Sequence, residues 1–138
     1  NKKLEPVMSM ETIITSVKKL QRDETVGYGN TFKAEKEMVI ATIPVGYYEG
    51  VDRRLSNKGS VLVSSEHDPC LIVGRVSMNI SVIDVSHIPD MKIGMPVSVI
   101  SDRIQDPNSL VSMAKICNTI PYELAVHVPE HLKRVIVD

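Results

Sequence analysis

Aromatic residues are scarce in this sequence. Its 138 residues include no Trp, one Phe and four Tyr, so aromatic residues make up only 4% of the chain. Proteins that bind single-stranded nucleic acid stack bases on several rings, and this chain offers few. A charge of one sign is also lacking, because the formal net charge is -1 and Lys and Arg are scattered. The sequence therefore indicates neither a phosphate-backbone surface nor a basic membrane patch, and we expect no nucleic-acid partner and no membrane contact.

Several motifs with well-known chemistry are missing as well. The chain has no glycine-rich phosphate loop and no serine in a nucleophile elbow. No apolar run approaches the roughly 20 residues that a membrane-spanning helix needs. The histidines lack HxxxH or HExxH spacing, so we interpret them as surface or structural residues and expect no metal site. They are His67, His87, His127 and His131.

Cysteine is rare too. The two cysteines, Cys70 and Cys117, lie far apart and match no metal-ligand spacing. A structural disulfide is one interpretation, but the chain has no other feature typical of secreted proteins, in which disulfides persist. We therefore expect two reduced, partly buried thiols.

The composition that remains is that of a globular protein, with 43% hydrophobic and 24% charged residues. A chain of this length suits one domain. Short β-branched runs that stop at turn residues predict strands, and their even spacing is typical of a barrel or sandwich. Segment 10–20 fits helix or strand, and its Thr, Ile and Val favour strand. The other predicted strands are 39–45, 60–64, 70–73, 80–85, 97–100 and 134–137.

One segment predicts a helix. The residues Asp-Pro-Asn-Ser at 106–109 form a capping cluster, and the apolar residues that follow recur at helical spacing. These are Leu110, Met113, Ala114 and Cys117. We expect a mainly β fold with one short helix near 109–118, and we find no linker that would divide the chain.

Two loops present phenols. Tyr28 stands between two glycines, where the backbone can turn tightly and no neighbouring side chain crowds the ring. The segment IPVGYYEG at 43–50 ends a strand in a loop with Tyr47, Tyr48 and Glu49. Loops at strand ends often carry function. Each loop also fits a purely structural interpretation. The first would be a turn with a packed tyrosine, and the second would be a polar hairpin loop.

Two further segments carry candidate residues. The segment GRVSMN at 74–79 includes Arg75 and Met78, and its small and polar residues could direct backbone N–H groups toward an anionic ligand. Methionine is more often core filler than a contact residue. The segment TIPYEL at 119–124 offers another phenol, Tyr122, which means little by itself.

In combination and in this order, the four segments resemble the C-terminal domain of alanine racemases, a family of pyridoxal-phosphate-dependent amino-acid racemases. The matching motifs are VGYGNTF, IPVGYYEGVDRRLSN, IVGRVSMN and TIPYEL, and the correspondence begins near Leu4. The resemblance implies an antiparallel, β-barrel-like C-terminal domain over 1–138, in the cytoplasm or on the cytoplasmic part of a membrane-anchored protein. It also implies a fragment of a longer protein, because the family carries its cofactor on a lysine of a separate TIM barrel.

The resemblance further implies how this domain takes part in catalysis. The family forms homodimers with composite active sites, which interconvert L- and D-alanine for peptidoglycan precursors. Racemisation needs one base on each face of the α-carbon. The cofactor lysine serves one face, and the tyrosine that matches Tyr28 serves the other across the dimer interface. Pyridoxal phosphate is the electron sink that acidifies the α-proton.

Other roles carry over by position. Tyr47 resembles a substrate-binding tyrosine that lines the access path of the substrate, and Arg53 and Arg75 resemble arginines further out along this path. Met78 matches a residue whose backbone N–H meets the substrate carboxylate. Tyr122 matches a tyrosine whose hydroxyl contacts the cofactor phosphate within its own subunit. Without the cofactor lysine, the isolated chain is expected to be inactive.

Two departures from the family pattern leave the substrate open. Ser77-Met78-Asn79 stands where Cys-Met-Asp is usual, which removes a charge beside the carboxylate site, and Tyr48-Glu49 stands where Ala-Asp is common. One alternative is therefore a membrane-anchored serine/alanine racemase of glycopeptide resistance. Another is a non-catalytic β-barrel module for binding or dimerisation. Tyr122, in a pocket that must stay small, favours alanine.

Overall fold

The computed structural model describes residues 4–64 and 67–137, and their fold is mainly β, as predicted. The strands in these ranges pair in an antiparallel sense within three sheets. The largest has the order β1-β9-β6-β7, the second has the order β2-β5-β8, and β3 and β4 form a small hairpin. The strands are β1 (Met10–Ile13), β2 (Ser16–Leu20), β3 (Thr25–Val26), β4 (Phe32–Lys33), β5 (Met38–Ile43), β6 (Ser60–Val63), β7 (Asp68–Leu71), β8 (Ser81–Asp84) and β9 (Pro96–Ile100).

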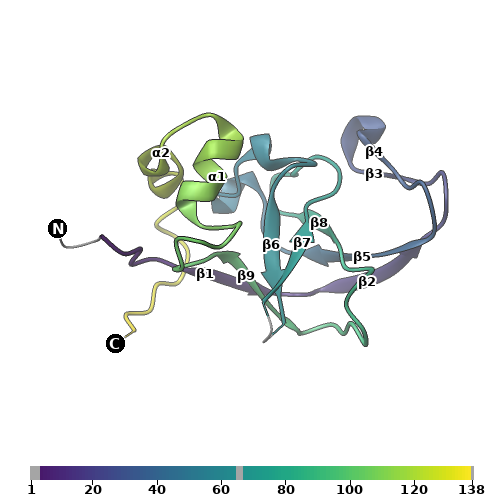
Figure 1. The fold of residues 1–138 in the computed structure, drawn as a ribbon, viewed down its shortest axis with the longest axis horizontal. Helices are drawn as coiled ribbons and strands as arrows, with labels where there is room; N and C mark the ends of the chain where they lie inside the picture. Colours follow the sequence, from purple (N-terminus) through teal and green to yellow (C-terminus); the bar gives the residue numbers. More distant parts are fainter. Residues whose placement is uncertain (1–3, 65–66, 138) are drawn as a thin grey trace.

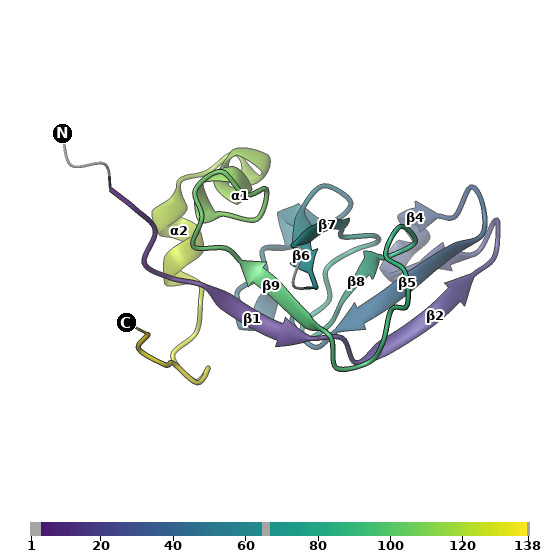
Figure 2. The same cartoon turned by 60° about the horizontal axis from the view of Figure 1, so that its bottom comes forward.

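Two residues between β1 and β2 carry the chain from the first sheet to the second. Ile14 is fully buried, and its backbone exchanges hydrogen bonds with Met95 (2.9 Å) and Gly94 (2.8 Å). The next N–H, of Thr15, donates to the carbonyl of Thr42 in β5 (2.9 Å). Figure 2 shows β1 and β2 as one band along the lower side of the view, where each forms the edge of its sheet. The strand prediction for 10–20 is confirmed, and the change of sheet explains its irregular pattern.

The sheets and helices enclose a common hydrophobic core. Ile43, Val63 and Ile83 are fully buried in β5, β6 and β8, and an isolated bridge between Ile72 and Ile83 joins the two larger sheets. Fully burying side chains of this size contributes about 1.5–3 kcal/mol each. A smaller apolar cluster, which includes Val26, lies by the β3–β4 hairpin.

Cys70 and Cys117 are free thiols in the larger core cluster, which confirms the expectation of two reduced cysteines. Both are more deeply buried than expected. Burial raises the pKa of the Cys70 thiol to about 12, and it also raises the pKa of Cys117. Because the thiolate is the reactive form, both thiols are inert structural residues.

Helix α1 (Leu110–Cys117) confirms the predicted helix, and the Ser109 side chain caps it by accepting a hydrogen bond from Ser112 N (3.2 Å). A second helix, α2 (Pro121–Val126), was not predicted. Six residues are too few for a clear helical period, so only its first-turn proline signalled it. Figure 1 places both helices at one end of the molecule and the β3–β4 hairpin at the other.

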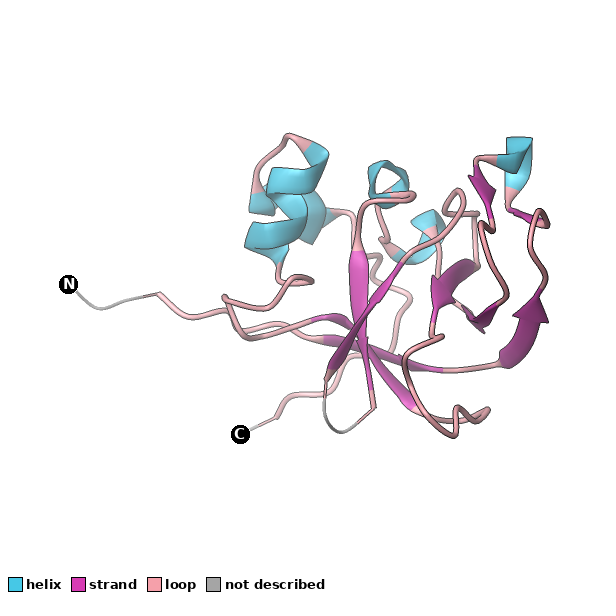
Figure 3. Ribbon diagram, turned by 45° about the vertical axis from the view of Figure 1, so that its right-hand side comes forward, coloured by secondary structure: helices cyan, strands magenta, loops and turns pink. Residues whose placement is uncertain are grey.

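Three short 3-10 turns complete the described elements: η1 (Tyr28–Asn30), η2 (Tyr47–Glu49) and η3 (Arg53–Leu55). In Figure 3 the helical segments follow one side of the molecule, with strands beneath them. The motif-bearing turns therefore share this side with α2. No helix in the described ranges is long and apolar enough to cross a membrane.

The predicted strand at 134–137 is wrong. This segment is irregular up to residue 137, and its apolar side chains are exposed, Ile136 by 96%. β-Branched residues favour strands because they fit a pleated, half-buried surface. Among the described residues, no strand pairs with this segment, so its propensity has no sheet to act on.

Candidate functional site

The Tyr28 loop depends on close backbone approach. Tyr28 begins η1 and is 70% exposed. Gly27 has φ 78° and ψ 176°, a conformation open essentially to glycine alone. A Cβ added at Gly27 would lie 2.9 Å from the backbone nitrogen of Arg75. Gly27 lets the loop settle onto the segment that begins at Gly74, and the loop leaves the phenol exposed.

Asn57 links this loop to the same segment. Its Oδ1 accepts a hydrogen bond from Gly74 N (2.6 Å), and its Nδ2 donates to the carbonyl of Thr31 (3.4 Å) just after η1. The neighbouring Ser56 Oγ accepts from Val76 N (2.9 Å). Sequence reasoning missed both residues, because their partners are 17 to 26 residues away along the chain.

The Tyr47 loop is joined to the other end of that segment. Tyr47 N donates to the carbonyl of Ser77 (3.0 Å), and Tyr48 N donates to the carbonyl of Met78 (2.9 Å). Gly46 packs so closely that an added Cβ would lie 2.0 Å from the Ser77 carbonyl oxygen. Tyr47 is 41% exposed and Met78 is 53% exposed. Two predicted substrate contacts thus lie on adjacent, hydrogen-bonded loops.

A carboxylate reinforces this junction. Glu49 Oε2 accepts a hydrogen bond from Gly46 N (2.7 Å), and Glu49 Oε1 accepts one from Asn79 Nδ2 (2.7 Å). The Glu49 N–H in turn donates to the Gly46 carbonyl (3.1 Å), which closes the turn. We call this arrangement of Gly46, Glu49 and Asn79 the loop clamp. The sequence showed a carboxylate in a polar loop but not its partner 30 residues away.

Tyr47 faces a hollow on the surface. The guanidinium carbon of Arg53 lies 5.7 Å from the centre of the Tyr47 ring, within cation–π range. A hollow of about 320 Å³ opens beside them, and Asp52 and His127 also line it. The predicted access-path residues Tyr47 and Arg53 are therefore direct neighbours.

Arg54 ties this region to the helices. Its guanidinium donates to Asp52 Oδ2 (2.8 Å), to the carbonyl of Cys117 at the end of α1 (3.2 Å) and to Glu123 Oε1 in α2 (3.3 Å). The hydrogen bonds from Arg54 hold the pKa of the Asp52 carboxyl below its usual range. Next to Glu123, Tyr122 is 78% exposed.

The structure brings five of the six predicted site residues into one neighbourhood. Segment 74–79, which contains Arg75 and Met78, contacts both the Tyr28 loop and the Tyr47 loop. Arg53 lies against Tyr47. The sixth residue, Tyr122, is linked to this neighbourhood through Glu123 and Arg54. All six are exposed, so this side of the chain presents functional groups outward.

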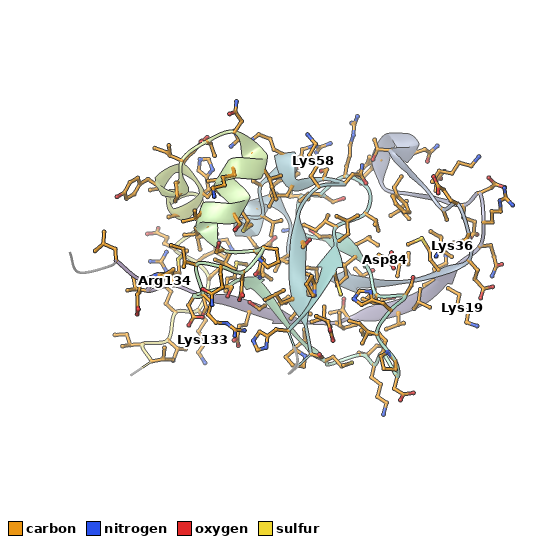
Figure 4. All side chains as sticks on the ribbon, viewed as in Figure 1. Lys19, Lys36, Lys58, Asp84, Lys133 and Arg134 are labelled. Carbon is orange, nitrogen blue, oxygen red and sulfur yellow. The ribbon has the colours of Figure 1, made fainter. Side chains whose placement is uncertain are left out.

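The lysines of the described chain fit no covalent cofactor site. A lysine that forms a covalent bond to a cofactor is typically activated by desolvation or by a neighbouring cation. Every lysine that the structure describes is exposed, and Figure 4 labels four of them, Lys19, Lys36, Lys58 and Lys133. No group of three His, Cys, Asp or Glu in the described ranges could hold a metal ion. Tyr122, with its free hydroxyl, fits a noncovalent contact to a phosphate group.

The family profile of the alanine racemase C-terminal domain matches residues 7–136. The chain belongs to this family. The alanine racemase of Leptospira interrogans is 35% identical over 138 residues, which cover 100% of this chain and 35% of that protein. Alanine racemases are isomerases, and this chain spans about a third of the length of such curated relatives.

Solved structures agree with the family assignment. The biosynthetic alanine racemase from Pseudomonas aeruginosa superposes with a TM-score of 0.86 at 32% identity, over 96% of this chain and 35% of that chain. The alanine racemase from Bartonella henselae, solved with covalently bound pyridoxal phosphate, has a TM-score of 0.82 at 27% identity, over 94% of this chain and 34% of that one. A histidine racemase from Leuconostoc mesenteroides superposes with a TM-score of 0.83 at 25% identity, over 94% of this chain and 34% of that chain. These relatives bear out a mainly β fold of antiparallel sheets with two short helices.

Proposed function

We propose that the chain is the C-terminal domain, over 1–138, of a pyridoxal-phosphate-dependent alanine racemase that works as a homodimer. In this proposal, it supplies Tyr28 as one of two bases that interconvert L- and D-alanine. The observation that carries the proposal is the placement of the Tyr28 and Tyr47 loops on the same segment, 74–79. This placement supports a site in which a phenol and an access path surround one substrate-binding turn.

The exposure of the site residues supports a composite active site. A proton transfer at the α-carbon needs a base within hydrogen-bonding reach and a site that excludes water. Tyr28 is 70% exposed here, and its glycine-flanked turn directs the phenol away from the core. A second subunit, with its own TIM barrel, would enclose this face and supply the opposite base.

The other residues bind and orient the substrate in this proposal. The Met78 N–H would donate to the substrate carboxylate, and the Tyr47 ring would restrict the path to it. Arg53 and Arg75 are exposed cations that would attract an amino-acid carboxylate toward that path. Segment 74–79 would keep Arg75 and Met78 in fixed positions relative to each other.

Pyridoxal phosphate, carried on a lysine outside this chain, supplies an electron sink when bound. Tyr122 would donate a hydrogen bond from its hydroxyl to the cofactor phosphate. Its position beside Glu123, which accepts from both Arg54 and Thr119, supports this role because helix α2 is held against η3 and the end of α1. We expect no metal ion at this site.

The experiment is a Tyr28→Phe substitution in the full-length enzyme. We expect it to slow α-proton exchange with deuterated solvent by about 100-fold or more from one alanine enantiomer, because a positioned general base contributes about 10²–10⁴-fold. Exchange from the other enantiomer should fall far less. Nuclear magnetic resonance measures the exchange separately for L- and D-alanine.

Tyr48→Phe is the matched control, since it removes a phenol from the same exposed side without touching the proposed base. Its exchange rates should stay close to those of the unmodified enzyme. Equal slowing of both enantiomers by Tyr28→Phe would contradict the two-base assignment.

Substrate preference is a separate part of the proposal. We expect alanine to be turned over faster than serine. Because a histidine racemase has the same fold, the assay also includes histidine as a third substrate. A non-catalytic module predicts no turnover of any of the three by the full-length protein, and no cofactor-bearing barrel upstream.

A further inference from the structure

Glu49 is the one described carboxylate whose hydrogen bonds reach both the turn of the Tyr47 loop and the Met78–Asn79 turn. Both bonds are short, at 2.7 Å, and each uses a different carboxylate oxygen. The Glu49 side chain is also partly shielded from solvent. A charged acceptor with two donors in such a place forms stronger hydrogen bonds than a neutral pair does.

We propose that the loop clamp of Gly46, Glu49 and Asn79 sets the spacing between the Tyr47 phenol and the Met78 backbone N–H, with Glu49 as a positioning residue for substrate binding. The inference rests on the proposed function, because it assigns substrate contacts to Tyr47 and Met78. Glu49 itself touches no substrate. It acts through the two loops that it holds together.

In this chain the geometry pairs one carboxylate with one amide. The Glu49 carboxylate only accepts hydrogen bonds, and the Asn79 amide nitrogen donates one. A second carboxylate at position 79 would face the first at hydrogen-bonding distance, without a donor between them. Like charges at this separation repel, so the clamp depends on the pair being matched.

The two backbone hydrogen bonds between the loops depend on the same junction. Tyr47 N donates to the Ser77 carbonyl and Tyr48 N donates to the Met78 carbonyl beside the close contact of Gly46 with Ser77 and Met78. Opening the Glu49–Asn79 contact would let the Met78 turn move away from Tyr47. The proposed consequence is weaker substrate binding with a smaller change in the chemical step.

The test compares Asn79→Asp, Glu49→Gln and the double variant in the full-length holoenzyme. We expect Asn79→Asp to raise the KM for alanine about tenfold and to change kcat by less than about threefold, as is typical for loss of a hydrogen bond to a charged group. The double variant should return KM to within about threefold of the unmodified enzyme. In it, the amide introduced at 49 accepts from Gly46 N and donates to the carboxylate introduced at 79.

Glu35→Gln is the matched control. Glu35 is an exposed glutamate between β4 and β5, outside the loop clamp, and its replacement should leave KM unchanged. An unchanged KM in Asn79→Asp would overturn the proposal. The proposal would also be overturned if the fold increase of KM in the double variant equalled the product of the fold increases in the two single variants. Such independence would show that the two side chains are not in direct contact.

Hydrogen–deuterium exchange of peptides covering 44–50 and 76–81 separates the clamp from the proposed function. Faster exchange of both peptides in Asn79→Asp, restored in the double variant, supports the clamp even if the enzyme racemises no amino acid. Unchanged exchange overturns the clamp even in an enzyme that is an active alanine racemase. Absence of turnover by the unmodified holoenzyme would overturn only the proposed function.

Discussion

The two phenol-bearing loops reach the same segment by different means. The Tyr28 loop rests on it mainly through glycine: Gly27 has positive φ and lies almost in contact with the Arg75 backbone. The Tyr47 loop is held by two backbone hydrogen bonds and by a carboxylate with two donors. The difference teaches that exposed side chains can be positioned either by removing steric bulk beneath them or by adding polar contacts around them.

The two means predict different sensitivities. A loop that depends on missing atoms fails when atoms are added, and a loop that depends on hydrogen bonds fails when donors or charges change. Gly46 combines both, since it packs against Ser77 and also donates to Glu49. The largest effect is therefore expected there.

Gly46→Ala should destabilise the chain by about 3 kcal/mol, from overpacking and the loss of loop hydrogen bonds. The new Cβ would lie 2.0 Å from the Ser77 carbonyl oxygen, so the loops must separate. Urea denaturation of the 138-residue chain measures this. Gly94→Ala is the control, since an added Cβ there meets nothing within 4 Å and only its φ of 90° adds strain. If Gly46→Ala is no worse than Gly94→Ala, the close approach is unimportant.

Gly27→Ala should cost less, about 2 kcal/mol, from the strained φ and ψ and from the contact of the new Cβ with the Arg75 backbone nitrogen. Gly29→Ala is the matched control in the same loop. It also has positive φ, but its added Cβ would lie 3.8 Å from the nearest atom, in the Arg75 side chain. We expect Gly27→Ala to lower the urea midpoint more than Gly29→Ala does. Equal losses would contradict the prediction, because they would show that neither the φ and ψ of Gly27 nor its contact with segment 74–79 limits this loop.

The smallest predicted effect is the pH dependence of stability that arises from the Asp52–Arg54 pair, near the Tyr47 loop. Because Arg54 lowers the pKa of Asp52, the stability that this carboxylate contributes is present above its unfolded pKa of 3.8 and is lost as pH falls through the lower folded value. Asp52→Asn should therefore lower the urea midpoint at pH 7 and not at the most acidic pH. The effect should be modest, because the Arg54 side chain is 45% exposed and solvent screens its charge.

Asp23→Asn is the matched control on the side of the Tyr28 loop, the loop that depends on glycine. Asp23 pairs with Lys33 at 2.9 Å, but both side chains are well exposed, and exposed pairs contribute little. Its urea midpoint should match that of the unmodified chain from acidic to neutral pH. A larger loss of stability in Asp23→Asn than in Asp52→Asn would contradict the conclusion that polar contacts matter more near the Tyr47 loop than near the Tyr28 loop.

Local sequence patterns predicted much of this fold. The strands β5, β6, β8 and β9 and the helix α1 lie within about two residues of their predicted bounds. Strand β7 begins two residues early, at Asp68. These elements depend on neighbouring residues: β-branched runs that stop at turns, and a serine that caps the first helical turn. Helix α2 was missed because six residues carry little periodicity.

The order of four motifs also identified the family, because each motif is weak alone and their combination is specific. Segment 134–137 shows the limit of local patterns. Its composition favours a strand, yet a strand exists only where another strand offers donors and acceptors. The same holds for the candidate site, where the tyrosines were recognised by type and spacing but not by their contacts.

The sequence by itself determined the mainly β class, the capped helix, the reduced cysteines and the residues that carry the family likeness. Those properties arise from neighbours along the chain or from burial that hydrophobic patterning requires. Only the tertiary structure decided that Glu49 meets Asn79, that Asn57 reaches both Gly74 and Thr31, and that the two phenol loops share segment 74–79. The hydrogen bonds of Asn57 and Glu49 join residues 17 to 30 positions apart, and hydrogen bonds over that separation depend on how the sheets pack.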